Sequence, residues 1–166
     1  MFIQIKNYKI KKFFKNSGFT LLETLIVVAV TATIATIGIG YYMNASKTKI
    51  LERATQEIVS LLKYAQQNSV SQKDSEQWGV HFENPVSGND FYALYKGATY
   101  SSPIEIKHLP EGVVFSTPSI GNSLNISFNK LTGTNYSGTN QFLVIQSTSS
   151  NATTTISVSS QGLISY

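Results

Sequence analysis

The chain contains no cysteine, and this absence excludes disulfide frameworks, thiolate zinc sites and cysteine nucleophiles. Charged residues are also scarce, because they form 13% of the 166 residues, well below the usual ~25%. Apolar residues nevertheless make up 42%, whereas disorder requires few apolar residues together with a high net charge. The composition therefore predicts a folded chain, and the length suits one domain with one additional element.

Side chains suited to catalysis are few: the sequence has two histidines, His81 and His108, and two aspartates, Asp74 and Asp90. An enzyme held by one membrane span is one interpretation, but it requires a nucleophile–base pair or a carboxylate pair in a cleft. The sequence has no glycine-rich phosphate loop after a strand and no metal-ligand spacing. We therefore predict a protein that is not an enzyme, with no catalytic, cofactor-binding or metal site.

The basic residues are unevenly distributed along the chain. Residues 1–18 contain five lysines and no acid, whereas the remainder has eight basic and nine acidic residues, a net charge of −1. The isoelectric point of the full chain, about 9.2, is therefore high because of this basic leader. If the leader is removed, the reason to expect an acidic partner is removed with it.

Residues 19–43 form an apolar stretch whose single charge is Glu23. Residues 24–46 carry no charge, and as a helix they span roughly 35 Å, enough for a bilayer core of ~30 Å. A buried core helix is the alternative, but the basic flank favours a transmembrane helix segment at 19–43. Because the lysines precede this segment, the positive-inside rule predicts a cytoplasmic N-terminus and a C-terminal part outside the cytoplasm.

Residues 44–73 are polar but carry an apolar stripe at steps of three to four residues, which predicts an amphipathic helix. No proline occurs between Phe19 and Lys73, so we expect one continuous helix over both segments. Arg53 and Glu57 are spaced to form an ion pair on its exposed side. The stripe consists of Ile50, Leu51, Ala54, Ile58, Leu61, Leu62 and Ala65.

From residue 74 to the end, short runs of alternating polarity are separated by turn-forming residues, which predicts antiparallel strands with one dry face. Ile104, Ile106 and His108 illustrate the alternation, and residues 160–162 suit a short hairpin loop with Gly162 in the left-handed position. The fold class is thus α+β, with a long N-terminal helix packed on one sheet or two. The expected strands are 78–83, 91–96, 104–108, 113–116, 124–129, 142–147, 154–159 and 163–166.

The junction between the leader and the apolar stretch has a distinctive order of residues. It reads Lys-Asn-Ser-Gly-Phe-Thr-Leu-Leu-Glu over residues 15–23. A glycine precedes the apolar run, and an acid lies five residues after this glycine. A secretory signal would instead place its cleavage site after the apolar run. This junction resembles the type III signal of type IV pilins and pseudopilins. The resemblance implies that prepilin peptidase cleaves between Gly18 and Phe19 and N-methylates Phe19.

Glu23 corresponds in this resemblance to the acidic fifth residue of the mature chain. An isolated carboxylate within a membrane segment costs several kcal/mol unless it is paired. The resemblance implies that Glu23 meets the N-terminal amine of a neighbouring subunit and so favours docking into a filament. A local role is also open, because an acid near a helix start interacts favourably with the helix dipole.

Small residues recur at four-residue steps in the apolar stretch, at Ala32, Thr36 and Gly40. Such a line allows helices to approach closely, in lipid or in a filament core. The general abundance of alanine and threonine in this run is the competing explanation.

The C-terminal part is similar to the GspH/FimT group of minor pseudopilins, on the basis of Trp-Gly-Val-His-Phe at 78–82 and the final hairpin. This implies a structural minor pilin or pseudopilin of a type II secretion pseudopilus or a type IV pilus. Its expected partners are prepilin peptidase, other pilins and an inner-membrane assembly platform. The expected location is the cytoplasmic membrane, with one span and the β domain outside, followed by a periplasmic or surface filament.

A DNA-binding minor pilin of a DNA-uptake machine is the alternative function. DNA binding requires clustered lysine or arginine side chains for phosphate contacts. From residue 74 onward there are three lysines against six acidic residues, which argues against nucleic acid as a partner.

Overall fold

The computed structural model describes residues 19–166, except for the side chains of residues 37–47. The chain divides into two compact units, Met1–Gly40 and Tyr41–Tyr166. Helix α1 (Leu21–Val70) contributes to both units. The predicted continuous helix is thereby confirmed, although it is shorter than the predicted stretch from Phe19 to Lys73.

The helix ends early because the backbone turns into left-handed conformations just after Val70. Gln72 has φ 53°, and the following 3-10 turn η1 (Lys73–Ser75) contains two more residues with positive φ. The Ser69 carbonyl at the helix end accepts hydrogen bonds from the backbone N–H groups of Gln72 (3.1 Å) and Leu131 (3.3 Å). These bonds satisfy a carbonyl that the helix itself leaves without a partner.

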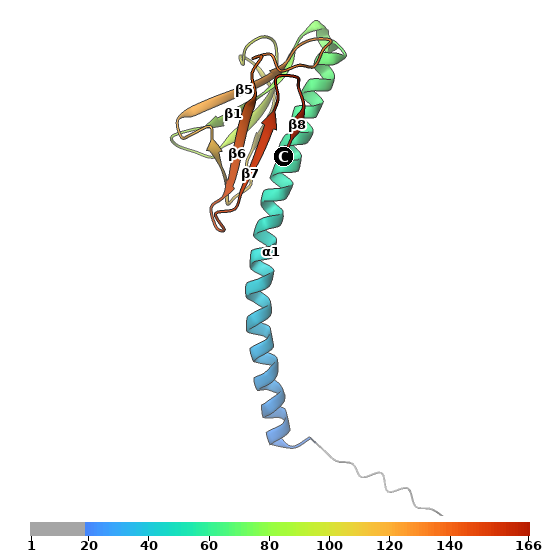
Figure 1. Ribbon diagram of the computed structural model, residues 1–166. Coiled ribbons are helices and arrows are strands. Elements are labelled where there is room, and N and C mark those ends of the chain that lie inside the picture. Colours follow the sequence, from blue (N-terminus) through green and yellow to red (C-terminus); the bar gives the residue numbers. More distant parts are fainter. Residues whose placement is uncertain (1–18) are drawn as a thin grey trace, which may run out of the picture. The chain divides into compact units, whose positions relative to one another are not determined.

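Eight strands follow and form two four-stranded antiparallel sheets (Figure 1), which answers the question of one sheet or two. The strand order is β3-β2-β1-β5 in sheet A and β4-β6-β7-β8 in sheet B. Every predicted strand is present, with ends within two residues of those predicted. The strands are β1 (Trp78–Asn84), β2 (Phe91–Lys96), β3 (Pro103–His108), β4 (Val113–Thr117), β5 (Asn122–Phe128), β6 (Gln141–Ser147), β7 (Thr153–Val158) and β8 (Ile164–Ser165).

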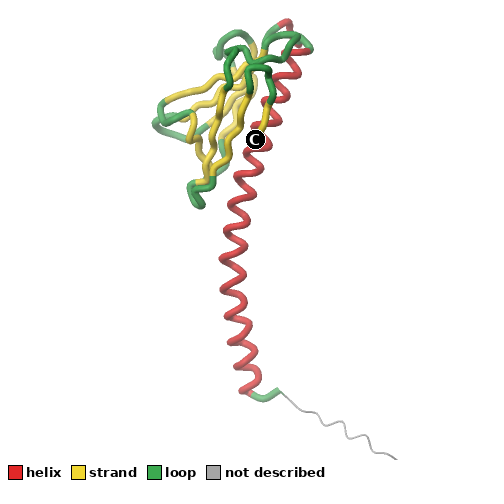
Figure 2. The backbone as a smooth tube through the Cα atoms, in the orientation of Figure 1, coloured by secondary structure: helices red, strands yellow, loops and turns green. Residues whose placement is uncertain are grey.

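The hydrophobic core lies in the second unit, between the C-terminal part of α1 and the two sheets, which Figure 2 shows beside the helix. The predicted apolar stripe supplies the helical side of this core, and among its members only Ile50 is partly exposed. The sheets supply alternate residues such as Val80, Phe82 and Ile126, which are fully buried. Burial of these side chains fixes which face of each strand turns inward.

The buried face of the helix also carries polar side chains that the apolar pattern did not predict. Ser69 is fully buried, and its Oγ accepts the backbone N–H of Trp78 at 2.7 Å. Thr55 donates its hydroxyl to the Leu51 carbonyl at 2.8 Å. Both groups are satisfied by hydrogen bonds, which removes the cost of burying them.

Glu57 has a different partner from the one predicted. Its Oε1 lies 2.8 Å from Lys107 Nζ, so the carboxylate joins α1 to β3 rather than pairing with Arg53. Burial, and secondarily the negative charge of Glu57, raise the pKa of Tyr92. The hydrogen bond to Glu57 raises the pKa of Lys107. The prediction was wrong because a cation from the sheet reaches the same carboxylate.

The prediction that β3 buries one apolar face is also wrong. Ile104 and Ile106 are 49% and 51% exposed, and His108 is exposed as well. The reason is topological, since β3 is an edge strand of sheet A and pairs only with β2 within the described chain. The predicted hairpin loop at 160–162 is confirmed, because Gly162 has φ 85°.

Candidate processing and assembly site

The first turn of α1 is closed by Thr20. Its Oγ1 accepts the backbone N–H of Glu23 at 3.2 Å, and its carbonyl accepts the N–H of Thr24 at 3.2 Å. Thr20 is therefore the N-cap, with Glu23 three residues later in the pattern of a capping box. The sequence interpretation missed this residue, although the order Thr-Leu-Leu-Glu contains the signal.

Glu23 lies in this first turn, where an acidic side chain interacts favourably with the partial positive charge of the helix N-terminus. The local role considered from the sequence is thus available to this side chain. Glu23 is exposed, and its carboxylate can also be reached by a partner. Gly18, the residue before the expected cleavage site, lies outside the described residues.

The apolar side chains of residues 19–36 have no cover within the first unit. Phe19 is 78% exposed and Leu21 is 82% exposed. Four consecutive residues of this class, 25–28, already point in nearly all directions around a helix. A helix that is apolar on all sides requires lipid or protein around it. The exposed members are Phe19, Leu21, Leu22, Leu25, Ile26, Val27, Val28, Val30 and Ile34.

The threonines of this segment direct their hydroxyls to the helix's own backbone. Thr31 Oγ1 donates to the Val27 carbonyl at 2.8 Å, and Thr33 Oγ1 donates to the Val30 carbonyl at 2.7 Å. Thr36 donates to the Thr33 carbonyl at 2.8 Å. Because these hydroxyls are satisfied locally, the threonines present methyl groups outward and suit an apolar environment.

Two of the three predicted packing residues, Ala32 and Thr36, are exposed on α1, and the third, Gly40, lies among the residues whose side chains are not described. Both therefore remain available to a second helix. Among the residues with described side chains, no part of the helix reaches the length and hydropathy that a bilayer crossing requires.

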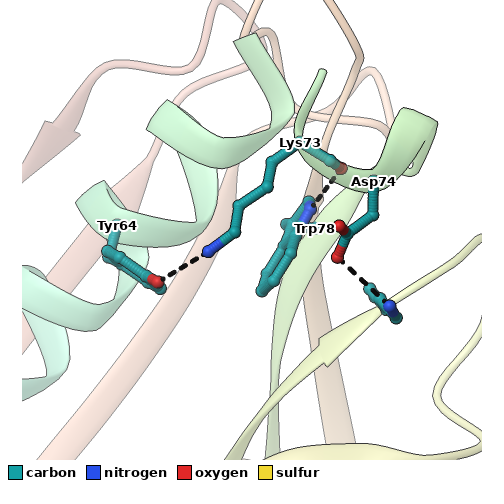
Figure 3. Close-up of polar contacts among 5 residues, drawn as sticks. Tyr64, Lys73, Asp74 and Trp78 are labelled. Carbon is teal, nitrogen blue, oxygen red and sulfur yellow. Dashed lines mark hydrogen bonds and ion pairs between the residues drawn. The ribbon is translucent and has the colours of Figure 1, made fainter. Parts of the chain in front are cut away.

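The lysines of residues 73–166 are each engaged within the chain. Lys73 Nζ lies 3.3 Å from the Tyr64 hydroxyl and 5.1 Å from the centre of the Trp78 ring, as Figure 3 shows. Lys96 pairs with Asp74 at 3.1 Å, and Lys107 pairs with Glu57. Lys130 Nζ donates to the Ser75 carbonyl at 3.1 Å. These contacts distribute the cations among local partners rather than gathering them on one free surface.

His81 is a packed residue of sheet A. Its Nδ1 lies 2.7 Å from Asn125 Oδ1, its Nε2 lies 3.1 Å from Glu83 Oε2, and its ring stacks on Tyr100 at 3.8 Å. His108 is exposed at the end of β3, and the rings of both histidines contact Phe91. In the part of the chain that the structure describes, no three histidine or acidic side chains come close enough to hold a metal ion.

Comparison with known proteins finds similarity in both the N-terminal motif and the fold. Residues 13–39 match the family model for the prokaryotic N-terminal methylation motif. Two crystal structures of the type IV minor pilin FimU from Pseudomonas aeruginosa (strain PAO1), in different crystal forms, have a similar fold. Their TM-scores are 0.55 and 0.51 at 15% and 17% identity, and the alignments cover 72% and 69% of this chain and 90% of each FimU chain. No curated protein is significantly similar in sequence.

The methylation motif covers the leader junction and the start of α1, and the fold similarity covers more than two thirds of the chain. The resemblance to pilins seen in the sequence is thereby confirmed, while membership in the GspH/FimT group stays a prediction. The chain thus combines a prokaryotic N-terminal methylation motif with a fold similar to that of a type IV minor pilin.

Proposed function

We propose that the chain is a structural, non-catalytic minor subunit of a type IV pilus or a type II secretion pseudopilus. The observation that carries the proposal is the methylation motif at 13–39, which includes the start of a helix with uncovered apolar side chains. A helix of this kind is stable only when other helices or lipid surround it. The two FimU structures, which are of a minor pilin, support the minor class.

Processing is the first step of this function. Prepilin peptidase cleaves between Gly18 and Phe19, which removes all five lysines of the leader, and the amine of Phe19 is then methylated. The new N-terminus lies one residue before the cap Thr20. A positively charged amine is thereby placed beside the first turn of α1, close in sequence to Glu23.

Assembly is the second step. The chain is held in the cytoplasmic membrane by residues 19–43, with the β domain outside, until the assembly platform transfers it to a filament. In the filament, the Glu23 carboxylate forms an ion pair with the N-terminal amine of a neighbouring subunit, because a carboxylate in apolar surroundings is stabilised by an opposite charge. Ala32, Thr36 and Gly40 form the line along which neighbouring helices approach.

The DNA-uptake alternative gains no support from the charges. The lysines at 96, 107 and 130 contact Asp74, Glu57 and the Ser75 carbonyl, respectively. Phosphate contacts would have to replace these partners. A salt-sensitive gel shift of DNA by the purified chain is the result that would favour this alternative.

The proposal is tested by co-expressing the chain with a cognate prepilin peptidase. The native chain should lose residues 1–18, whereas Gly18→Ala should remain at full length. Ser17→Ala is the matched control, because it changes the neighbouring small residue and should leave cleavage intact. Normal trimming of Gly18→Ala, or loss of trimming in both variants, would contradict the assigned cleavage site.

A further inference from the structure

The free edge of sheet A, at β3, differs from the other sheet edges. In the described part of the chain, β3 pairs with β2 on one side, and its backbone has no hydrogen-bond partner on the other. All of its residues except Lys107 are exposed, Ile104 and Ile106 to about half of their surface. An exposed edge of this length is a template for pairing with another strand.

The other three edges are covered or short. At β4, the Phe115 N–H donates to Asp90 Oδ2 at 2.6 Å, and the Phe115 carbonyl accepts from Asn84 Nδ2 at 2.9 Å. At β5, the Ser127 carbonyl accepts the Tyr136 N–H at 2.8 Å. The last edge, β8, has two residues. Other parts of the chain therefore contact the β4 and β5 edges, whereas no backbone hydrogen bond reaches the outer side of β3 among the described residues.

The sequence of β3 is complementary to itself when two copies run antiparallel. With Ile106 opposite Ile106 of a second copy, Glu105 of each chain faces Lys107 of the other. Opposite charges placed directly across two strands stabilise the pair, whereas like charges destabilise it. This register thus gives two favourable charge pairs around a central apolar pair.

Lysines at an edge often prevent pairing, but the charge of Lys107 is balanced by neighbouring carboxylates. Its Nζ is bound to Glu57 of α1 at 2.8 Å and lies 3.5 Å from Glu105. On the opposite face of the strand, Ile106 is 51% exposed beside the aromatic pair of Phe91 and His108. A second copy would cover this apolar surface.

We infer that β3 is a self-association strand, which pairs antiparallel with β3 of a second copy in the register centred on Ile106. The contact is isologous and closes as a two-fold pair, whereas a filament grows by heterologous contacts. The pair is therefore a state distinct from the filament. It does not depend on the proposed processing of the N-terminus.

The absence of native cysteine allows a direct test in the full chain, in its membrane or in detergent micelles. Directly opposed residues of antiparallel strands have Cα atoms about 4.5–5.5 Å apart, within reach of a disulfide. Ile106→Cys should therefore give an oxidised dimer. His108→Cys is the matched control, since its own copies are offset by four residues, roughly 14 Å, and should not cross-link.

The charges are tested in the Ile106→Cys background. Glu105→Lys should lower the dimer fraction roughly tenfold, whereas Glu111→Lys, the same change at an exposed site outside β3, should have no effect. Lys107→Glu should also weaken pairing, and a mixture of the Glu105→Lys and Lys107→Glu chains should cross-link with each other. If Lys107→Glu impairs folding, the comparison of Glu105→Lys with Glu111→Lys decides whether the charge pairs of this register form.

The inference would be overturned if Ile106→Cys and His108→Cys cross-link equally, or if neither does. Cross-linking of Cys at position 106 to a different protein would overturn the choice of a second copy as the occupant. An unchanged dimer fraction in Glu105→Lys would overturn the register.

Discussion

Thr20 Oγ1 accepts a hydrogen bond from the backbone N–H of Glu23 at 3.2 Å, which fixes the start of α1 at Leu21, two residues after Phe19. The expected mature chain therefore begins with one residue, then the cap, then the helix. A new amine at Phe19 would lie at the positive end of the helix dipole, where an anionic partner is favoured. The cap and the proposed cleavage site thus lie at the same end of the helix.

Removal of the cap should loosen the first helical turn. Thr20→Val keeps the shape of the side chain but removes the acceptor, and loss of an N-cap costs about 1 kcal/mol. Amide hydrogen exchange of residues 22–24 should become several-fold faster, because that free energy changes the local opening equilibrium. Thr20→Ser retains the acceptor and should exchange like the native chain. Equal exchange in Thr20→Val and the native chain would show that the cap does not hold this turn.

The charge of Glu23 can be separated from its local role in the helix. Glu23→Ala and Glu23→Gln should both be trimmed and remain in the membrane, and both should be depleted from isolated filaments, because neither carries the negative charge that pairs with the amine. Glutamine still supports a capping box. If Glu23→Gln is incorporated as well as the native chain while Glu23→Ala is not, the role of this residue is local capping.

The elements could be predicted from the sequence to a large extent, because each has a local signal. Alternating polarity revealed the strands, and the three-to-four-residue stripe from Leu51 to Ala65 revealed the buried helix face. The outward placement of Ile104 and Ile106 could not be predicted, since alternation does not tell whether a strand lies at the edge of a sheet. That information depends on strand order, which is a property of the whole domain.

The polar contacts were the least predictable part of the molecule. Ser69 accepts the N–H of Trp78, and Glu57 binds Lys107, across 9 and 50 residues of sequence, respectively. No local pattern specifies such partners. The cap at Thr20 is different, because its signal lies within four consecutive residues and was available in the sequence.

The buried hydrogen bond between Ser69 and Trp78 should contribute measurably to stability. Ser69→Ala leaves the Trp78 N–H without its acceptor, so the free energy of unfolding should fall by about 1–3 kcal/mol. Ser71→Ala is the matched control, because Ser71 is exposed and its change should be within about 0.5 kcal/mol. Urea unfolding followed by the fluorescence of Trp78, the only tryptophan, provides the measurement. Equal losses in the two variants would contradict the role of Ser69.

Tyr92 should make stability depend on alkaline pH. Burial raises its pKa above the ordinary value of 10.0, so the folded chain keeps this proton at a pH where the unfolded chain releases it. The stabilisation is complete below pH 10 and is lost as the pH rises further. Above pH 10, the free energy of unfolding of the native chain should fall more steeply than that of Tyr92→Phe, by up to about 1.4 kcal/mol per pH unit. Parallel slopes in the two chains would contradict burial of an un-ionised Tyr92.

The N-terminal mass of the chain isolated from its native cells tests the central claim most directly. The account predicts that mass spectrometry finds an N-methylated Phe19 as the first residue, with the lysine-rich leader absent. An intact Met1, or a mature N-terminus downstream of residue 43, would contradict it.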